Sequence, residues 1–350
     1  MVNYRIVKDL ASPAAHHSID SKVMGDRDTF YKPPVPLAIP PIYIWPPRLW
    51  ASIRYLALNL MLQWGGIFYI ALAWLCWEYL TPDPQHLATL QWWWVSLIWL
   101  RNVFLWASLA GGLYWWLYIL KGQGQNYKYD DKWPERGNRK FTFSDQVKDN
   151  MFWSIFSSCT AWSLWESVTL WLYASGRVSG YEWSEAPFYL SLMLLGTFFW
   201  MTFHFYCIHR LIHWRPLYRL THYLHHRNIS TNPWTGISMH PIESMIYFSS
   251  IALWWFVPVH PVIILLTGLF TGLSPAFSHS GFDKIRLSSN QALPSGIFFH
   301  DLHHRLYEVN YGTLLTPVDS LMGTMHDGTE NSQEQFVARQ RRMLNTKQYR

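Results

Sequence analysis

Four long apolar segments follow one another along the chain, at about residues 55–78, 102–120, 152–174 and 187–208. Each is close to the roughly 20 residues that an α-helix needs to cross a bilayer. A fifth apolar stretch, about 245–277, is interrupted by Val-Pro-Val-His-Pro at 257–261. Because proline breaks helices, we expect a helical hairpin there that turns near the far interface, or a re-entrant pair of helices, in place of one straight helix. The pattern predicts an all-α integral membrane protein with about four transmembrane helices plus this hairpin.

The polar segments divide the chain into regions. Residues 1–50 are polar and then proline-rich, which predicts an arm that lies along the membrane surface. Residues 51–199 hold the predicted transmembrane helices and a basic connector, and residues 329–350 form a polar tail. Between them, residues 200–328 hold most of the histidines and are expected to form a helical cap at the membrane face.

Basic residues gather in some connectors and avoid others. The connector 121–150 holds seven Lys or Arg and 209–244 holds four, whereas 81–92 holds none and 175–186 holds one. With four spans and a hairpin, all the basic connectors and both termini fall on one face. The positive-inside rule predicts that this face, with the histidines, is cytoplasmic, at the endoplasmic reticulum or the bacterial inner membrane. The net charge of +6 therefore indicates membrane orientation and no nucleic-acid partner.

Composition agrees with a membrane protein. Half of the residues are hydrophobic, 23 are Trp and only 14% are charged, whereas soluble domains carry about 25% charged residues. Two charges need an explanation in this layout of spans. We expect Arg101 to snorkel from the outer edge of the second span and Glu166 to lie inside the third.

The sixteen histidines carry the strongest chemical signal. Eight of them form three clusters beside the ends of apolar segments: an H-x3-H at His209 and His213, an H-x2-H-H at His222, His225 and His226, and another at His300, His303 and His304. Residues three and four apart share one face of a helix, so each cluster can direct its imidazoles to one place. Eight imidazoles are too many for one tetrahedral zinc and suit two metal ions. Imidazole binds Fe, Zn, Cu and Ni, so the ligands alone leave the metal open.

The three boxes, in this order and spacing, resemble the fatty acid hydroxylase and sterol desaturase superfamily. Three further stretches are similar to motifs of that family: His240-Pro-Ile-Glu243, His279-Ser-Gly-Phe-Asp283, and Asn310-Tyr-Gly with Asp319 and Gly323-Thr324 after it. The resemblance covers about residues 200–328 and implies that they are the catalytic region. It departs from the family pattern at Tyr223, where a basic residue is common, and at Val318-Asp319-Ser320, where an aromatic-Asp-Arg triplet is common.

The resemblance implies a di-iron centre that uses O2 to hydroxylate or desaturate a lipid. The eight box histidines would be the iron ligands, and His279 would be an additional one. Side chains expected around the ligands, as partners of ring N–H groups or as packing, are His204, His240, Glu243, Asp283, Asp301 and Asp319. The remaining histidines, among them His86, His260 and His326, are expected at the surface.

The resemblance favours a sterol-like substrate, with fatty acyl chains and other lipids still open, and leaves hydroxylation or desaturation undecided. Electrons would come from a separate cytochrome b5-like or ferredoxin-like protein, ultimately from NAD(P)H.

Two other classes of protein compete with this interpretation. A zinc-dependent membrane hydrolase needs fewer ligands and usually the motif H-E-x-x-H, which the sequence lacks. A haem protein pairs one histidine per helix, and a metal transporter carries its ligands inside the spans. The metal and chromophore of the purified protein would distinguish the three classes.

Overall fold

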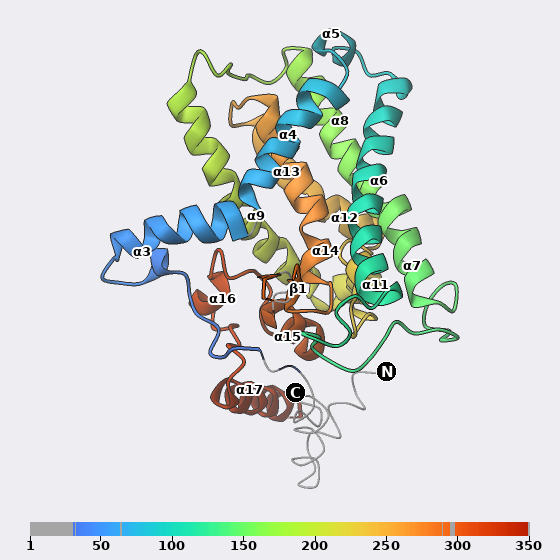
Figure 1. Cartoon of the computed structure of the whole chain (residues 1–350), viewed down its shortest axis with the longest axis vertical. Helices are drawn as coiled ribbons and strands as arrows, with labels where there is room; N and C mark the ends of the chain where they lie inside the picture. The colour runs from blue at the N-terminus through green and yellow to red at the C-terminus, as the bar shows by residue number, and fades with distance from the viewer. Residues whose placement is uncertain (1–30, 32, 64, 289, 295–297, 349–350) are drawn as a thin grey trace.

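The computed structural model describes residues 31, 33–63, 65–288, 290–294 and 298–348, and the chain is mostly helical there (Figure 1). The first half contains η1 (Pro41–Tyr43), α3 (Leu49–Arg54), η2 (Tyr55–Gln63), α4 (Gly66–Leu80), α5 (Pro84–Leu87), α6 (Trp92–Tyr114), η3 (Trp115–Ile119), α7 (Gln146–Trp153), η4 (Ser154–Cys159) and α8 (Thr160–Ala174). The second half contains α9 (Pro187–Ile212), α10 (Arg215–Leu217), η5 (Tyr218–His222), α11 (Tyr223–His226), η6 (Pro233–Thr235), α12 (Pro241–Tyr247), η7 (Phe248–Trp255), α13 (Pro261–Leu273), α14 (Pro275–Ser278), β1 (Lys284–Arg286), β2 (Ala292–Pro294), α15 (Phe298–Leu306), α16 (Val318–Leu321) and α17 (Glu330–Gln348). The two short strands pair antiparallel.

Among the described residues, three helices are long and apolar enough to cross a membrane: Trp92–Ile119, Pro187–Ile212 and Pro261–Ser278. The bent pair Leu49–Gln63 and Gly66–Leu80, which changes direction by 54°, would be a fourth if it forms one span. The helix Pro187–Ile212 lies at the fourth predicted span. The helix Trp92–Ile119 lies at the second, but it begins ten residues earlier than expected. The first half of the bent pair, from α3 through η2, projects sideways from the bundle (Figure 1).

The third predicted span differs from expectation. Residues 146–174 form the continuous helical run α7–η4–α8, but this run is not among the helices with the apolarity of a membrane span. Its serines and threonines lower the hydropathy, and several of them are buried and bonded to neighbouring segments. Ser158 Oγ donates to Ile237 O at 2.6 Å, for example. The run is therefore held by polar contacts to the protein as well as by apolar packing.

The predicted hairpin is present, and its second limb forms the centre of the bundle. The chain turns between Trp255 and Pro261, and α13 then runs back with every residue buried. A Cβ atom at Gly268 would lie 2.4 Å from Trp162 Nε1, and one at Gly272 would lie 2.7 Å from the same indole ring. Glycine at both positions thus lets α8 approach α13 closely.

Arg101 and Glu166 form a buried ion pair between α6 and α8. The expectation that Arg101 snorkels at a membrane edge is wrong, because the residue is buried within α6. Its Nη1 also donates to Thr81 Oγ1 at 3.1 Å, and Asn102 Nδ2 donates to Ser163 Oγ at 3.0 Å. A buried guanidinium requires such partners, and the neighbouring helices supply them.

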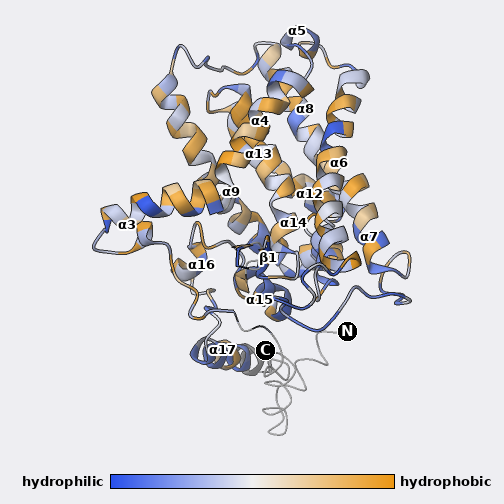
Figure 2. Cartoon of the chain, in the orientation of Figure 1, coloured by the Kyte–Doolittle hydropathy of each residue, from blue (hydrophilic) through white to orange (hydrophobic). Residues whose placement is uncertain are grey.

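Hydrophobic residues dominate α4, α9 and α13, and hydrophilic residues gather at the end of the molecule that holds α15 and α17 (Figure 2). The connectors that contain few basic residues, at α5 and between α8 and α9, lie at one end, while α11, α15 and α17 lie at the other (Figure 1). The basic connector after η3 reaches this second end, where Gln123 Nε2 donates to Lys284 O at 2.9 Å. The predicted N-terminal arm falls outside the described residues up to residue 30. Farther along, the side chains of Trp45 and Trp50 are exposed.

Candidate metal centre

The histidines of the first box follow directly from a long apolar helix. α9 ends at Ile212, with His209 in its last turn and His213 as the C-terminal cap. The spacing of four residues places both imidazoles on the same side of the helix. Pro216 lies in α10, where the chain begins a new helical run, and this run continues through η5 into α11 with the second box.

The second and third boxes divide their histidines in complementary ways between two groups. His222 and His226, four apart, join one group, and His225 joins the other. In the third box His300 and His304 stay together in the second group, while His303 joins the first. On a helix, positions four apart differ by about 40° and the residue between them points about 100° away from its neighbour. The H-x2-H-H spacing therefore serves two sites from one helix.

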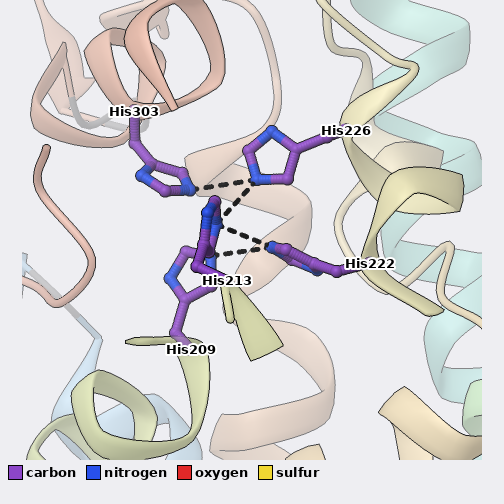
Figure 3. A group of neighbouring side chains, drawn as sticks. All are labelled: His209, His213, His222, His226 and His303. Atoms are coloured by element: carbon purple, nitrogen blue, oxygen red, sulfur yellow. Dashed lines mark hydrogen bonds between the residues drawn. The ribbon is translucent and has the colours of Figure 1, made fainter. Parts of the chain in front are cut away.

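Group one consists of His209, His213, His222, His226 and His303, and group two of His225, His279, His300 and His304. Within each group, one ring nitrogen of every histidine lies within 4.8 Å of all the others. The members of group one converge from α9, the η5–α11 run and α15 (Figure 3). His213 is partly exposed and the other eight histidines are buried.

Several rings have their outward nitrogen fixed by the protein. The Nδ1 atoms of His209 and His303 donate to the carbonyls of Tyr311 and Val309, both at 2.6 Å. Those of His225 and His279 donate to Ser238 O at 3.3 Å and Pro275 O at 3.0 Å. A carbonyl only accepts, so these four rings carry their proton on Nδ1. In a neutral ring the Nε2 atom is then a free lone pair directed into its group.

The rings are held in neutral forms by burial. Desolvation lowers the pKa of His225 to about 4 and the pKa of His303 to about 3. Burial first, and then repulsion from other imidazoles, also lowers the pKa of His222, His226 and His304 well below the usual value. Neutral imidazole is the form that binds a metal ion.

The nitrogens of group two do not satisfy one another. Nε2 of His225 and Nε2 of His279 lie 3.3 Å apart, although both rings have their proton on Nδ1. Neither nitrogen can donate to the other, so their lone pairs face each other and repel. His304 has no hydrogen-bond partner on either ring nitrogen among the described residues. A cation between the rings would remove both problems.

Group one also has too few ring protons for its nitrogen–nitrogen contacts. Its Nε2 atoms form a chain of four contacts, from His209 through His222, His213 and His226 to His303, at 3.0–3.2 Å (Figure 3). The two end rings have no proton on Nε2, so the three middle rings can supply at most three protons for four contacts. Two nitrogens at about 2.1 Å from one ion and about 90–105° apart lie about 3.0–3.3 Å from each other. The observed spacing fits ligands of a shared metal ion.

Of the acidic residues expected around the ligands, Glu243 alone bonds to a box histidine among the described contacts. Its Oε1 lies 2.6 Å from His222 Nδ1. Asp283 accepts from the hydroxyl of Tyr129, Asp301 pairs with Arg305, and Asp319 accepts from backbone N–H groups. These three acids therefore support the surroundings of the histidines and do not bond to their rings.

The remaining expected histidines lie outside both groups. His204 Nε2 lies 3.0 Å from Ser249 Oγ, and His240 caps α12 by accepting from Ile242 N–H. His86 is exposed as expected, whereas His260 and His326 are buried, so their assignment to the surface was wrong. His260 caps α13 beside the ring of Trp74, and His326 lies next to Gln333.

The sequence did not indicate the main-chain carbonyls that fix the rings, at Ser238, Pro275, Val309 and Tyr311. Every residue has the same main-chain carbonyl whatever its side chain, so no residue pattern marks such an acceptor.

The fold and the site define a helical protein with segments of membrane-spanning length and a buried, histidine-rich site of the metal-binding type. Residues 194–324 match the model of the fatty acid hydroxylase family. This match confirms the resemblance found in the sequence for this part of the chain, which is similar to proteins of the fatty acid hydroxylase and sterol desaturase superfamily.

Two curated relatives agree with this resemblance. A stretch of 144 residues is 29% identical to the Delta(7)-sterol 5(6)-desaturase of Eremothecium gossypii, and it covers 40% of this chain and 39% of that protein. A stretch of 149 residues is 30% identical to methylsterol monooxygenase 1 of Gallus gallus, and it covers 41% of this chain and 50% of that protein. The chain thus spans half or less of the length of these relatives. No solved structure matches the chain.

Proposed function

We propose that this protein is a membrane oxygenase that hydroxylates or desaturates a sterol-like lipid with O2 at a di-iron centre. One observation carries the proposal: two neighbouring groups of buried histidines each bring their ring nitrogens together at the spacing of ligands on one metal ion. Group one would hold one iron with five imidazoles and group two the other with four. Bound iron would supply the activation of O2 and the attack on an unactivated C–H bond.

The protein's own part is to hold the rings, to exclude water and to position the lipid. The carbonyls and Glu243 fix the ring orientations, and burial keeps the rings unprotonated. Phe205 stacks on His209 with ring centroids 4.8 Å apart, and Tyr247 packs against Phe205 from the apolar core. The apolar interior therefore reaches the histidines at this point, and we infer that the reacting carbon of the lipid approaches there.

The sterol-like substrate rests on the names of the relatives, a sterol desaturase and a methylsterol monooxygenase. The two electrons that each oxygenation requires would come from a separate protein of the cytochrome b5 or ferredoxin type. The positive-inside rule supports a cytoplasmic position for the histidine end, since the basic connector 121–150 reaches that end. A donor on that side could then reach the iron.

The test is the metal content of the protein purified in detergent, measured beside two variants. We expect about two irons per chain in the parent, clear loss of iron in His303→Ala, and no change in His86→Ala, which removes an exposed histidine at the opposite end. Zinc in place of iron would favour a hydrolase, and a Soret band would favour a haem protein. Iron that is equally present in His303→Ala would show that the boxes are not the ligand set.

A further inference from the structure

Two ligands of group one are fixed by a single three-residue segment of the chain. His303 donates to the carbonyl of Val309 and His209 to the carbonyl of Tyr311, both at 2.6 Å. His209 belongs to α9 and His303 to α15, which are far apart in the sequence. The conformation of residues 309–311 therefore sets the rotation of two imidazoles that arrive from different helices.

The middle residue of this segment is locked by its side chain. Asn310 has φ of +54°, a conformation that asparagine tolerates better than most residues, and it is completely buried. Its Nδ2 donates to the carbonyls of Phe299 and His326, both at 3.0 Å, and its Oδ1 accepts from His326 N–H at 2.7 Å. All three bonds go to main-chain atoms, so the amide ties the segment to the start of α15 and to the chain after Gly323.

The Tyr311 end of the segment is held by one carboxylate. Asp319 accepts from Tyr311 N–H at 2.9 Å and from Gly312 N–H at 2.7 Å. It also accepts from Thr324 Oγ1 at 2.6 Å. A Cβ at Gly312 would lie 3.0 Å from Asp319 Oδ2 and 3.2 Å from the ring of Tyr206, so a larger residue there would displace the carboxylate or α9.

We propose that Asn310 and Asp319 are positioning residues for group one. They act through the carbonyls of Val309 and Tyr311, which orient His303 and His209. Group two does not use this segment, because His225 and His279 donate to Ser238 and Pro275 instead. Loosening residues 309–311 should therefore weaken one metal position and spare the other. This inference rests on the proposed two-metal site.

The expected size of the effect follows from the behaviour of outer partners of metal ligands, whose loss weakens metal binding by about 10–100-fold. Asp319→Asn keeps the shape of the side chain and places an amide N–H against backbone donors. Asn310→Gly removes the amide and keeps a residue that adopts positive φ without strain. Neither variant deletes a ligand.

The experiment titrates Fe²⁺ anaerobically into chelator-stripped protein in detergent and measures the affinity and number of bound ions. We expect two tight equivalents in the parent, and in Asp319→Asn one tight equivalent and one at least about 10-fold weaker. Asn310→Gly should weaken the same equivalent. Adding His279→Ala to Asp319→Asn should remove the remaining tight equivalent, which would place it in group two.

The matched control is Thr267→Val, an isosteric change that removes a buried hydrogen bond from Trp254 Nε1 to Thr267 Oγ1. Thr267 lies twelve positions before His279, or about 18 Å along a helix at about 1.5 Å per residue. This variant should keep both tight equivalents.

Two outcomes would overturn the positioning role: parent-like affinity at both positions in Asp319→Asn, or equal weakening of both positions. If the parent protein binds no iron, that result would instead contradict the proposed function.

Discussion

His222 Nδ1 lies 2.6 Å from Oε1 of Glu243, and both side chains are almost fully buried. The second oxygen of Glu243, Oε2, has no hydrogen-bond partner among the described residues. Burial raises the pKa of Glu243 and lowers the pKa of His222, so the uncharged form of each is favoured without metal. A cation on the other nitrogen of His222 would reverse this preference, because it favours a carboxylate that accepts the Nδ1 proton.

The substitution Glu243→Gln tests this pairing. It preserves the size of the side chain but gives His222 a weaker, neutral acceptor, so we expect iron at group one to bind about 10–100-fold more weakly. The measurement is anaerobic Fe²⁺ titration. Asp283→Asn is the control, because that carboxylate accepts from the Tyr31 and Tyr129 hydroxyls and not from a histidine. Equal weakening in both variants would count against a specific role for Glu243.

The division of the histidines into two groups makes a second prediction. His213 belongs to group one and His279 to group two. His213→Ala and His279→Ala should therefore each lower the iron content from about two to about one per chain, and the double variant should retain none. Metal analysis and Mössbauer spectra of ⁵⁷Fe-loaded protein would measure both the content and the loss of a paired centre. Two irons in His279→Ala would remove this residue from the ligand set.

The buried neutral rings predict that the metal-free protein is destabilised by acid. The pKa of His225 is lowered to about 4 in the folded protein, against about 6.5 in an unfolded chain. Below pH 6.5 the unfolded chain therefore takes up more protons, and stability that is complete above this pH is lost as the pH falls towards 4. Each histidine of this kind contributes a slope of about 1.4 kcal/mol per pH unit.

Thermal unfolding of metal-free protein between pH 7.5 and 5 measures this loss. His225→Asn, which has a side chain that does not titrate, should show a shallower dependence on pH than the parent. A midpoint that stays constant from pH 7 to 5 in the parent would show that the rings are accessible or already charged.

The clustering of the histidines follows from the spacing in the sequence, but the assignment of each ring to one of the two groups does not. The spacing of His300, His303 and His304 predicted that these rings share one helix and approach one place. Which ring belongs to which group depends on how α15 is turned relative to α9 and η5, and that is decided by packing. The roles of the acidic residues near the boxes were harder to predict from the sequence. Glu243 and Asp319 stand in equally suggestive motifs, yet only Glu243 reaches a ring.

The fold shows the same limit. Apolar length located α9 and the hairpin around Pro261. It misplaced the start of α6, because the Trp-rich stretch that begins at Trp92 suits a membrane interface as well as a helix. Tertiary contacts decided the environment of Arg101, since the sequence does not show that Glu166, 65 residues later, lies beside it.

The Arg101–Glu166 pair supplies the last prediction. Both side chains are buried, so Glu166→Leu would leave an uncompensated guanidinium between α6 and α8. Breaking such a pair from one side costs about 3–5 kcal/mol, whereas replacing both partners with apolar residues of similar size is close to neutral. Thermal unfolding in detergent should therefore show a large loss for Glu166→Leu and a substantial recovery in the double variant with Arg101→Met. Glu78→Gln, at an exposed acid of α4, should change little. Recovery in the double variant would establish the pair as a helix clamp. Equal losses in both would mean that the loss comes from the other contacts of Glu166, such as Asn102 Nδ2 to its Oε2, and not from an unpaired Arg101.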